Sequence, residues 1–430
     1  MNKYILNEEN KQNLLNNLLK RSTSNYPEYE KKVALICEDV KERKDEALFE
    51  YTLKYDKYAL NKDNIRVTEA EVEEAVKNLD PELYAIMQEA FNNIKTYHEK
   101  QVRNSFFDTT EDGTFLGQRI MPIETVGVYV PGGKAAYPSS TLMNIVPALV
   151  AGCKRIVMAT PCNSEGKVSD TTLAAAKICG INEIYKIGGA QAIASLAFGT
   201  ETVPKVSKIV GPGNIFVALA KRYVYGHVSI DSIAGPSEIL VLADETANPK
   251  FVAADLMSQC EHDEMASGIL ITTSEELAND VEKYVEEFLK DAPRKEILEK
   301  SLDKFGFILV AKDIKEAVDA VNDIASEHLE ILTKNPLETM GMVKNAGAIF
   351  LGEYSSEPLG DYFAGPNHVL PTNGTAKFFS PLSVDDFIKK SSVICFSKDA
   401  LEKCHTKIEK FAKSEGLYAH SKSIEVRFEK

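Results

Sequence analysis

The sequence predicts an α/β protein whose parallel sheets are covered by helices on both faces. From about residue 115, short β-branched runs alternate with stretches of helical periodicity. Repeated strand–helix units of this kind imply parallel strands joined by right-handed crossovers. Several runs end in Pro and Gly, which predicts binding loops at the carboxyl edges of the sheets.

The expected elements follow one another along the chain. Residues 1–26 carry leucines on one helical face, which predicts a docking helix, and residues 27–105 read as charged helices. Strands are expected in TVGVYVPGG, RIVMATP, EIYKIGG, SKIVGPG, EILVLAD, GILITTS, FGFILVAK, LEILTK and AIFLGEY. After about residue 376 the alternation weakens into a short C-terminal piece.

Length and charge limit the class of protein. A chain of 430 residues is long enough for two or more domains. Its 64 acidic and 50 basic residues argue against nucleic acid or an anionic membrane as the main partner. No apolar run approaches the ~20 residues of a membrane span. The seven cysteines are odd in number and form no C-x-x-C, which predicts reduced thiols in a cytoplasmic enzyme.

Three Gly-rich segments, VPGGKAAYP, IGGAQA and VGPGNIF, each follow an expected strand. Backbone N–H groups at helix starts bind phosphate, so three such loops together favour an anionic ligand such as a nucleotide. None of them is the G-x-G-x-x-G dinucleotide motif with an acidic residue downstream. An ordinary tight turn explains any single loop equally well.

Two segments contain candidate catalytic or metal-binding residues. ASEHLEIL places Glu327 and His328 between a helix and a strand, either as a proton-transfer pair or as a solvated helix end. In SQCEHDE, Gln259 and His262 lie three apart on one helical face, as two metal ligands would. A surface histidine is the alternative. Zinc needs about four donors, and further candidates stand at Asp361, His368, Glu415 and His420.

The longer motifs resemble those of histidinol dehydrogenase, in order from about residue 30 to the C-terminus. They are VGVYVPGGKAAYPSSTLMNIVPALVAGC, GGAQAIASLAFGT, VPKVSKIVGPGN, AGPSEILVLAD, QCEH, SEHLEI, GDYFAGPNHVLPT and EGLYAHS. The resemblance implies an oxidoreductase that uses one Zn²⁺ per subunit and NAD. Such an enzyme oxidises L-histidinol to L-histidine through L-histidinal, the final step of histidine biosynthesis. It also implies a homodimer with shared active sites, built from two large domains resembling incomplete Rossmann folds plus small N- and C-terminal pieces.

The matching motifs assign the family's site residues to positions in this sequence. The resemblance implies Glu327 and His328 as the catalytic pair. It implies zinc ligands at Gln259, His262, Asp361 and His420. The implied substrate contacts are Ser237, Gln259, His262, His328, Asp361, His368, Glu415 and His420. The implied NAD contacts are Tyr129, Gln191 and Asn214, one in each Gly-rich motif.

We expect the following division of the chain. The segments are a docking helix for the dimer (1–26), a first α/β domain (27–128 with 241–376), a second α/β domain with the cofactor loops (129–240), and a C-terminal domain that reaches the partner subunit (377–430). Two other functions use the same residues. One is a zinc hydrolase with Glu327 as the water activator, which the absence of H-E-x-x-H weakens. The other is a non-catalytic nucleotide- or metal-binding protein.

Overall fold

The computed structural model describes residues 1–21, 26–132 and 137–429. The chain divides into two compact units, Met1–Gln101 with Ile123–Phe387 and Val102–Pro122 with Ile388–Lys430. The first unit contains parallel sheets A and B, and the second contains an antiparallel sheet C. The predicted α/β class with parallel sheets is therefore confirmed. In the described residues, no helix is long and apolar enough to cross a membrane.

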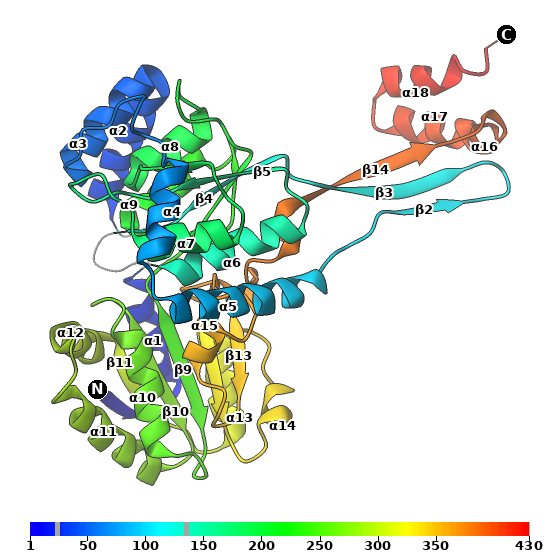
Figure 1. Cartoon of the computed structure of the whole chain (residues 1–430). Helices are drawn as coiled ribbons and strands as arrows, with labels where there is room; N and C mark the ends of the chain where they lie inside the picture. The colour runs from blue at the N-terminus through cyan, green and yellow to red at the C-terminus, as the bar shows by residue number, and fades with distance from the viewer. Residues whose placement is uncertain (22–25, 133–136, 430) are drawn as a thin grey trace. The chain divides into compact units, whose positions relative to one another are not determined.

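Sheet A is parallel throughout, with the strand order β1-β11-β10-β9-β12-β13 (Figure 1). Its strands are β1 (Asn2–Ile5), β11 (Gly306–Val310), β10 (Ser267–Thr272), β9 (Glu238–Ala243), β12 (His328–Leu332) and β13 (Ala348–Leu351). Side chains alternate between two apolar cores: Ile239 and Val241 face one, and Leu240 and Leu242 face the other. Successive strand residues point to opposite faces, so this alternation requires helices on both sides.

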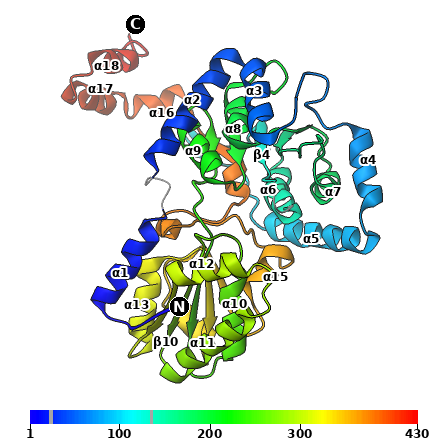
Figure 2. The ribbon, with the colours of Figure 1, turned by 90° about the vertical axis from the view of Figure 1, so that its left-hand side faces the viewer.

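Two groups of helices cover sheet A. The helices are α1 (Glu8–Leu19), α10 (Pro249–Cys260), α11 (Glu275–Leu289), α12 (Lys295–Phe305), α13 (Ile314–Ile324), α14 (Pro336–Met340) and α15 (Glu357–Tyr362). Helices α1 and α13 pack in the core on one face, and α10, α11 and α12 pack in the core on the other (Figure 2).

Sheet B is also parallel, with the order β6-β5-β4-β7-β8. Its strands are β6 (Ile184–Tyr185), β5 (Arg155–Ala159), β4 (Thr125–Tyr129), β7 (Lys208–Val210) and β8 (Ser229–Ile230). The helices around it are α2 (Pro27–Arg43), α3 (Asp45–Asp56), α4 (Glu69–Asn78), α5 (Pro81–Glu99), α6 (Pro138–Val150), α7 (Asp170–Ile178), α8 (Gly189–Phe198) and α9 (Ile215–Val224). Helices α4 to α7 share one core, and α2, α3, α8 and α9 share the other.

The helices α2 to α5 differ from the expected division. Residues 27–128 were expected to join residues 241–376, but α2 to α5 pack on sheet B, and β4 is one of its strands. The predicted boundary between residues 128 and 129 therefore cuts through β4. An apolar helix face shows that the helix packs against a core, but the face carries no information on which of two sheets provides it.

The N-terminal segment also differs from its prediction. Strand β1 pairs with β11, and Leu14 and Leu18 of α1 are buried in a core of sheet A. The apolar face of this helix thus packs within the chain, whereas the prediction assigned it to a partner subunit. Residues 22–25 of this segment, and residues 133–136 of the first Gly-rich loop, lie outside the described residues.

All nine expected strands are present in the structure, as β4 to β7 and β9 to β13. Sheet C was not predicted, and its strands are β14 (Ile388–Cys395), β3 (Phe115–Pro122) and β2 (Phe106–Thr109), paired antiparallel. It belongs to the second unit with α16 (Lys398–Glu402), α17 (His405–Ser414) and α18 (Tyr418–Glu425). Two 3₁₀ turns, η2 (Thr375–Lys377) and η3 (Val384–Phe387), precede β14.

Candidate functional site

Glu327 and His328 lie at the amino end of β12, where the sequence placed a helix-to-strand junction. Helix α13 ends at Ile324, and Ala325 adopts a left-handed conformation (φ 52°) that turns the chain into the sheet. His328 is the first residue of β12 and pairs with Ile239 of β9. Both side chains are buried, at 8% and 4% exposure. The solvated helix end that the sequence left open is therefore contradicted.

A single residue of the neighbouring strand orients both side chains. The backbone N–H of Glu238 donates to Glu327 Oε2 (2.9 Å). The backbone carbonyl of Glu238 lies 3.0 Å from His328 Nδ1 and can only accept, so Nδ1 carries the proton. In the neutral ring this leaves the lone pair on Nε2, because the partner of one ring nitrogen sets the tautomer.

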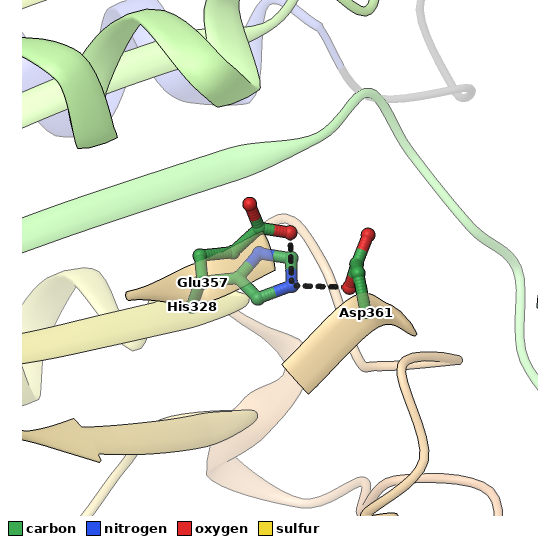
Figure 3. Close-up of side chains that lie close together, drawn as sticks. All are labelled: His328, Glu357 and Asp361. Atoms are coloured by element: carbon green, nitrogen blue, oxygen red, sulfur yellow. Dashed lines mark ion pairs between the residues drawn. The ribbon is translucent and has the colours of Figure 1, made fainter. Parts of the chain in front are cut away.

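The Nε2 atom of His328 faces two carboxylates from α15. It lies 3.8 Å from Glu357 Oε1 and 3.8 Å from Asp361 Oδ1 (Figure 3). Ligand atoms of these three residues lie within 4.8 Å of one another, close enough to hold a metal ion. His328 Nε2 and Glu357 Oε1 are buried without a hydrogen-bond partner among the described residues. Buried polar atoms usually find partners, so such atoms indicate a missing ligand.

Burial and charge shift the pKa values of this cluster. Burial raises the pKa of Glu327 to about 8. Burial alone would lower the pKa of His328, but the carboxylates of Glu327 and Asp361 outweigh it and raise the pKa to about 10. Burial also raises the pKa of Glu357 to about 7. Several strongly shifted pKa values in one buried cluster are typical of sites that move protons.

The other candidates of the first unit gather around the same cluster. Gln259 is buried near the end of α10 and its Nε2 finds no hydrogen-bond partner in the described chain. Asp361 is close enough to act electrostatically on the rings of His262 and His368. Ser237 directly precedes Glu238 and accepts a backbone hydrogen bond from Ser267 (3.0 Å). The amide, imidazole and carboxylate groups of Gln259, His262 and Asp361 form a donor set that zinc accepts.

Glu415 and His420 are the two candidates in the second unit. Glu415 caps the end of α17 and His420 lies in α18, and both are exposed. Their predicted roles as substrate contact and zinc ligand stay predictions.

The expected NAD contacts lie at the carboxyl ends of strands in sheet B. Tyr129 ends β4, and its hydroxyl accepts a hydrogen bond from Gly189 N (3.1 Å). Gln191 is buried in the first turn of α8, and Asn214 is the N-cap of α9. At Gly211, which has φ +121°, a Cβ would lie 2.0 Å from the carbonyl oxygen of Tyr129, so only glycine lets the loops after β4 and β7 meet.

The sequence reasoning missed Glu357 and Glu238. Glu357 and Asp361 lie four apart in α15, a spacing that puts both carboxylates on one helix face and could have revealed the first. Glu238 had no comparable signal, because its backbone groups make the contacts and every residue except proline has both.

Three comparisons relate the chain to known proteins. The family model described as histidinol dehydrogenase matches residues 19–428. A histidinol dehydrogenase of Geobacillus kaustophilus (strain HTA426) is 55% identical over 413 residues, covering 96% of this chain and 97% of the relative. One from Listeria monocytogenes serovar 1/2a is 52% identical over 425 residues, covering 99% and 97%. The crystal structure of histidinol dehydrogenase from Elizabethkingia anophelis superposes with a TM-score of 0.91 at 39% identity, covering 99% of this chain and 98% of that one.

Proposed function

Because the chain belongs to the histidinol dehydrogenase family, we propose that it oxidises L-histidinol to L-histidine in two steps, each passing a hydride to NAD. The reaction ends histidine biosynthesis and passes through L-histidinal. The observation that carries this proposal is the buried pair of Glu327 and His328, with the unpartnered Nε2 atom directed at Asp361.

His328 acts as the proton acceptor in this proposal. The surrounding carboxylates raise the pKa of the ring to about 10, so this role requires bound zinc, whose charge would oppose them. The neutral ring, with its Nδ1 proton donated to the Glu238 carbonyl, then presents a lone pair on Nε2. That nitrogen accepts the proton of the substrate alcohol as the hydride departs. After it has released that proton to solvent, the same nitrogen accepts another when the hydrated aldehyde is oxidised. The ring does not need to turn between the two steps, since Nδ1 stays bound to the carbonyl.

Glu327 activates the water that adds to the aldehyde. Burial raises the pKa of this carboxyl to about 8, which makes its ionised form a stronger base than an exposed glutamate. The hydrogen bond from Glu238 N to Oε2 fixes the carboxyl and leaves its second oxygen for the water.

Gln259, His262, Asp361 and His420 are the proposed zinc ligands. The carboxylate of Asp361 and the unpartnered atoms His328 Nε2 and Glu357 Oε1 fit a cation at this place. Zinc, when bound, supplies coordination positions that orient the imidazole and amine of histidinol and a charge that opposes the carboxylates around His328. Tyr129, Gln191 and Asn214 are proposed to hold NAD, and Ser237, His368 and Glu415 to contact the substrate.

We also propose a homodimer in which His420 and Glu415 complete the site of the partner subunit. Their exposed positions in the second unit support this arrangement. Mixing inactive His262→Ala chains with inactive His420→Ala chains tests it. After random exchange about a quarter of the sites would be intact, since half the dimers are mixed and one of their two sites escapes both lesions. Absence of recovery after verified exchange would place all ligands in one chain.

The absorbance of reduced cofactor, followed on mixing the protein with histidinol and NAD, tests the proposed function. We expect two reduced cofactors for each histidinol, with histidine as the product. A zinc hydrolase or a binding protein would form none. Histidinal supplied directly should yield one reduced cofactor per molecule, which separates the second oxidation from the first. Failure to reduce NAD with either substrate in zinc-loaded protein would overturn the proposal.

A further inference from the structure

Glu238 occupies a central place beside the catalytic pair. It is the buried first residue of β9, and its two peptide groups bind Glu327 Oε2 and His328 Nδ1 at 2.9 and 3.0 Å. Substitution of its side chain would leave both backbone bonds in place. Whatever fixes the position of Glu238 therefore fixes the orientation of both catalytic side chains.

The side chain of Glu238 forms a buried ion pair with Arg21, which follows α1 and lies 217 positions away in the sequence. The exposure of the two side chains is 0% and 4%. A second guanidinium nitrogen of Arg21 donates to the carbonyl of Met265 (3.0 Å). The guanidinium also lies 5.5 Å from the centre of the Phe305 ring. Contacts from three separate segments thus hold this group in one place.

Docking of the N-terminal helix does not require a buried arginine. Leu14 and Leu18 already bury the apolar face of α1, and Lys11 binds Asp323 of α13 at 2.7 Å. A buried charge is costly unless it is paired, and both members of this pair have lost nearly all contact with water. The positive charge of Arg21 also balances the carboxylate of Glu238, whose negative charge acts on Glu327.

We infer that Arg21 is a positioning residue, which acts through Glu238 to hold Glu327 and His328 in the geometry needed for proton transfer. This inference rests on the proposed function. A small displacement of a catalytic group can reduce the rate about a hundredfold, even when its cause lies outside the reacting groups. Arg21 touches neither substrate nor cofactor in this account, so its effect should appear in kcat rather than in KM.

The test compares Arg21→Met with Lys11→Met. Both changes remove a cation that ties the N-terminal segment to the rest of the first unit, but Lys11 contacts Glu8 and Asp323 and not Glu238. We expect Arg21→Met to lower kcat roughly 10- to 100-fold while the KM values for histidinol and NAD change less than about threefold. Lys11→Met should keep the wild-type kcat. Arg21→Lys should recover part of the loss, since it keeps the charge but not the forked hydrogen bonds.

Two further measurements keep the inference open to refutation. The pH profile of kcat should change in Arg21→Met and stay as in the wild type in Lys11→Met. If Arg21→Met does not fold, Arg21→Met combined with Glu238→Met replaces it, because the two changes remove the ion pair without leaving an unpaired buried charge. A folded protein carrying the single or the double change, with wild-type kcat and pH profile, would overturn the inference. Wild-type protein that reduces no NAD would instead overturn the proposed function.

Discussion

Sheets A and B present their candidate residues at opposite ends of their strands. In sheet B, Tyr129, Gln191 and Asn214 follow the carboxyl ends of β4, β6 and β7. In sheet A, Glu238 and His328 are the first residues of β9 and β12, so the cluster lies at the amino edge. The Gly-rich loops of sheet B lie at its carboxyl edge, where binding by them stays a prediction, whereas the candidate cluster of sheet A lies at the opposite edge.

Helix polarity explains what each edge can bind. Helices α8 and α9 begin at the carboxyl edge of sheet B, and free N–H groups at a helix start favour anions such as the phosphates of a dinucleotide. Helices α10 and α13 end at the amino edge of sheet A, where the negative end of the helix dipole favours a cation. In parallel strand–helix units, one edge therefore suits phosphate and the other suits metal.

Removal of the proposed zinc ion should produce the largest contrast between the two sheets. We expect treatment with a strong chelator to abolish turnover and zinc to restore it, while NAD still binds. The fold should persist, because apolar cores hold both sheets. Activity assays, NAD titration and far-ultraviolet circular dichroism on the same sample measure the three effects. Unfolding on chelation would show that the metal is structural.

Glu327→Gln should affect only the chemistry at sheet A. Loss of a positioned base costs about 10²- to 10⁴-fold, and we expect this loss in the oxidation of histidinal. The first oxidation, from histidinol, should fall much less, since its proton goes to His328. His328→Asn should slow both steps. Single-turnover measurements started from alcohol and from aldehyde distinguish these cases, and equal damage to both steps by Glu327→Gln would refute the division of roles.

Asn214→Ala is the matching change at sheet B. The side chain caps α9 by accepting from Phe216 N and Val217 N at 3.0 and 3.3 Å. Loss of this cap should cost about 1 kcal/mol of stability. Loss of the proposed contact with the cofactor should raise the KM for NAD about two- to tenfold with little change in kcat. Asn214→Asp keeps the cap and serves as the control. A fall in kcat alone would assign Asn214 to the chemistry.

A further prediction concerns the pH dependence of stability. Burial and the Asp255 carboxyl raise the pKa of Glu330 well above its ordinary value, so folding favours its protonated form. The contribution of protonated Glu330 to stability is complete below the pKa that this group has in the unfolded chain, near 4.3. It is lost as pH rises toward the folded pKa, by up to about 1.4 kcal/mol per pH unit. Glu330→Gln should therefore unfold at higher urea concentration than the wild type at pH 8, with a smaller difference at pH 5.

Glu71, in helix α4 beside sheet B, should show the opposite dependence of stability on pH. Burial would raise its pKa, but Lys186 and the hydrogen bonds from Thr68 together outweigh burial and lower it. Its contribution to stability is present above the unfolded pKa and lost as pH falls, so Glu71→Gln should weaken the fold at neutral pH. The effect should be small because Glu71 is 33% exposed. If the urea concentration of unfolding changes with pH in the same way for the wild type and for Glu330→Gln, the interpretation of Glu330 as a buried carboxyl with a raised pKa is wrong.

Local features of the sequence were enough to predict much of the fold and part of the site. The alternation of β-branched runs and helical stretches predicted the strands β4 to β7 and β9 to β13. Strand β1, strand β8 and sheet C escaped prediction. Strand β1 precedes the region in which strands and helices alternate, β8 has no buried residue, and β3 and β14 are exposed over much of their length.

The sequence by itself determined which residues are neighbours along the chain, and only the tertiary structure decided which segments meet. Glu327 and His328 are adjacent covalently, and Gln259 and His262 share a helix end, so both pairs were visible in the sequence. The contact between Arg21 and Glu238, and the choice of sheet for α2 to α5, depend on strand register and on packing between distant segments. Such pairing leaves no local periodicity, because one apolar face fits several cores and backbone hydrogen bonds are the same for nearly every residue.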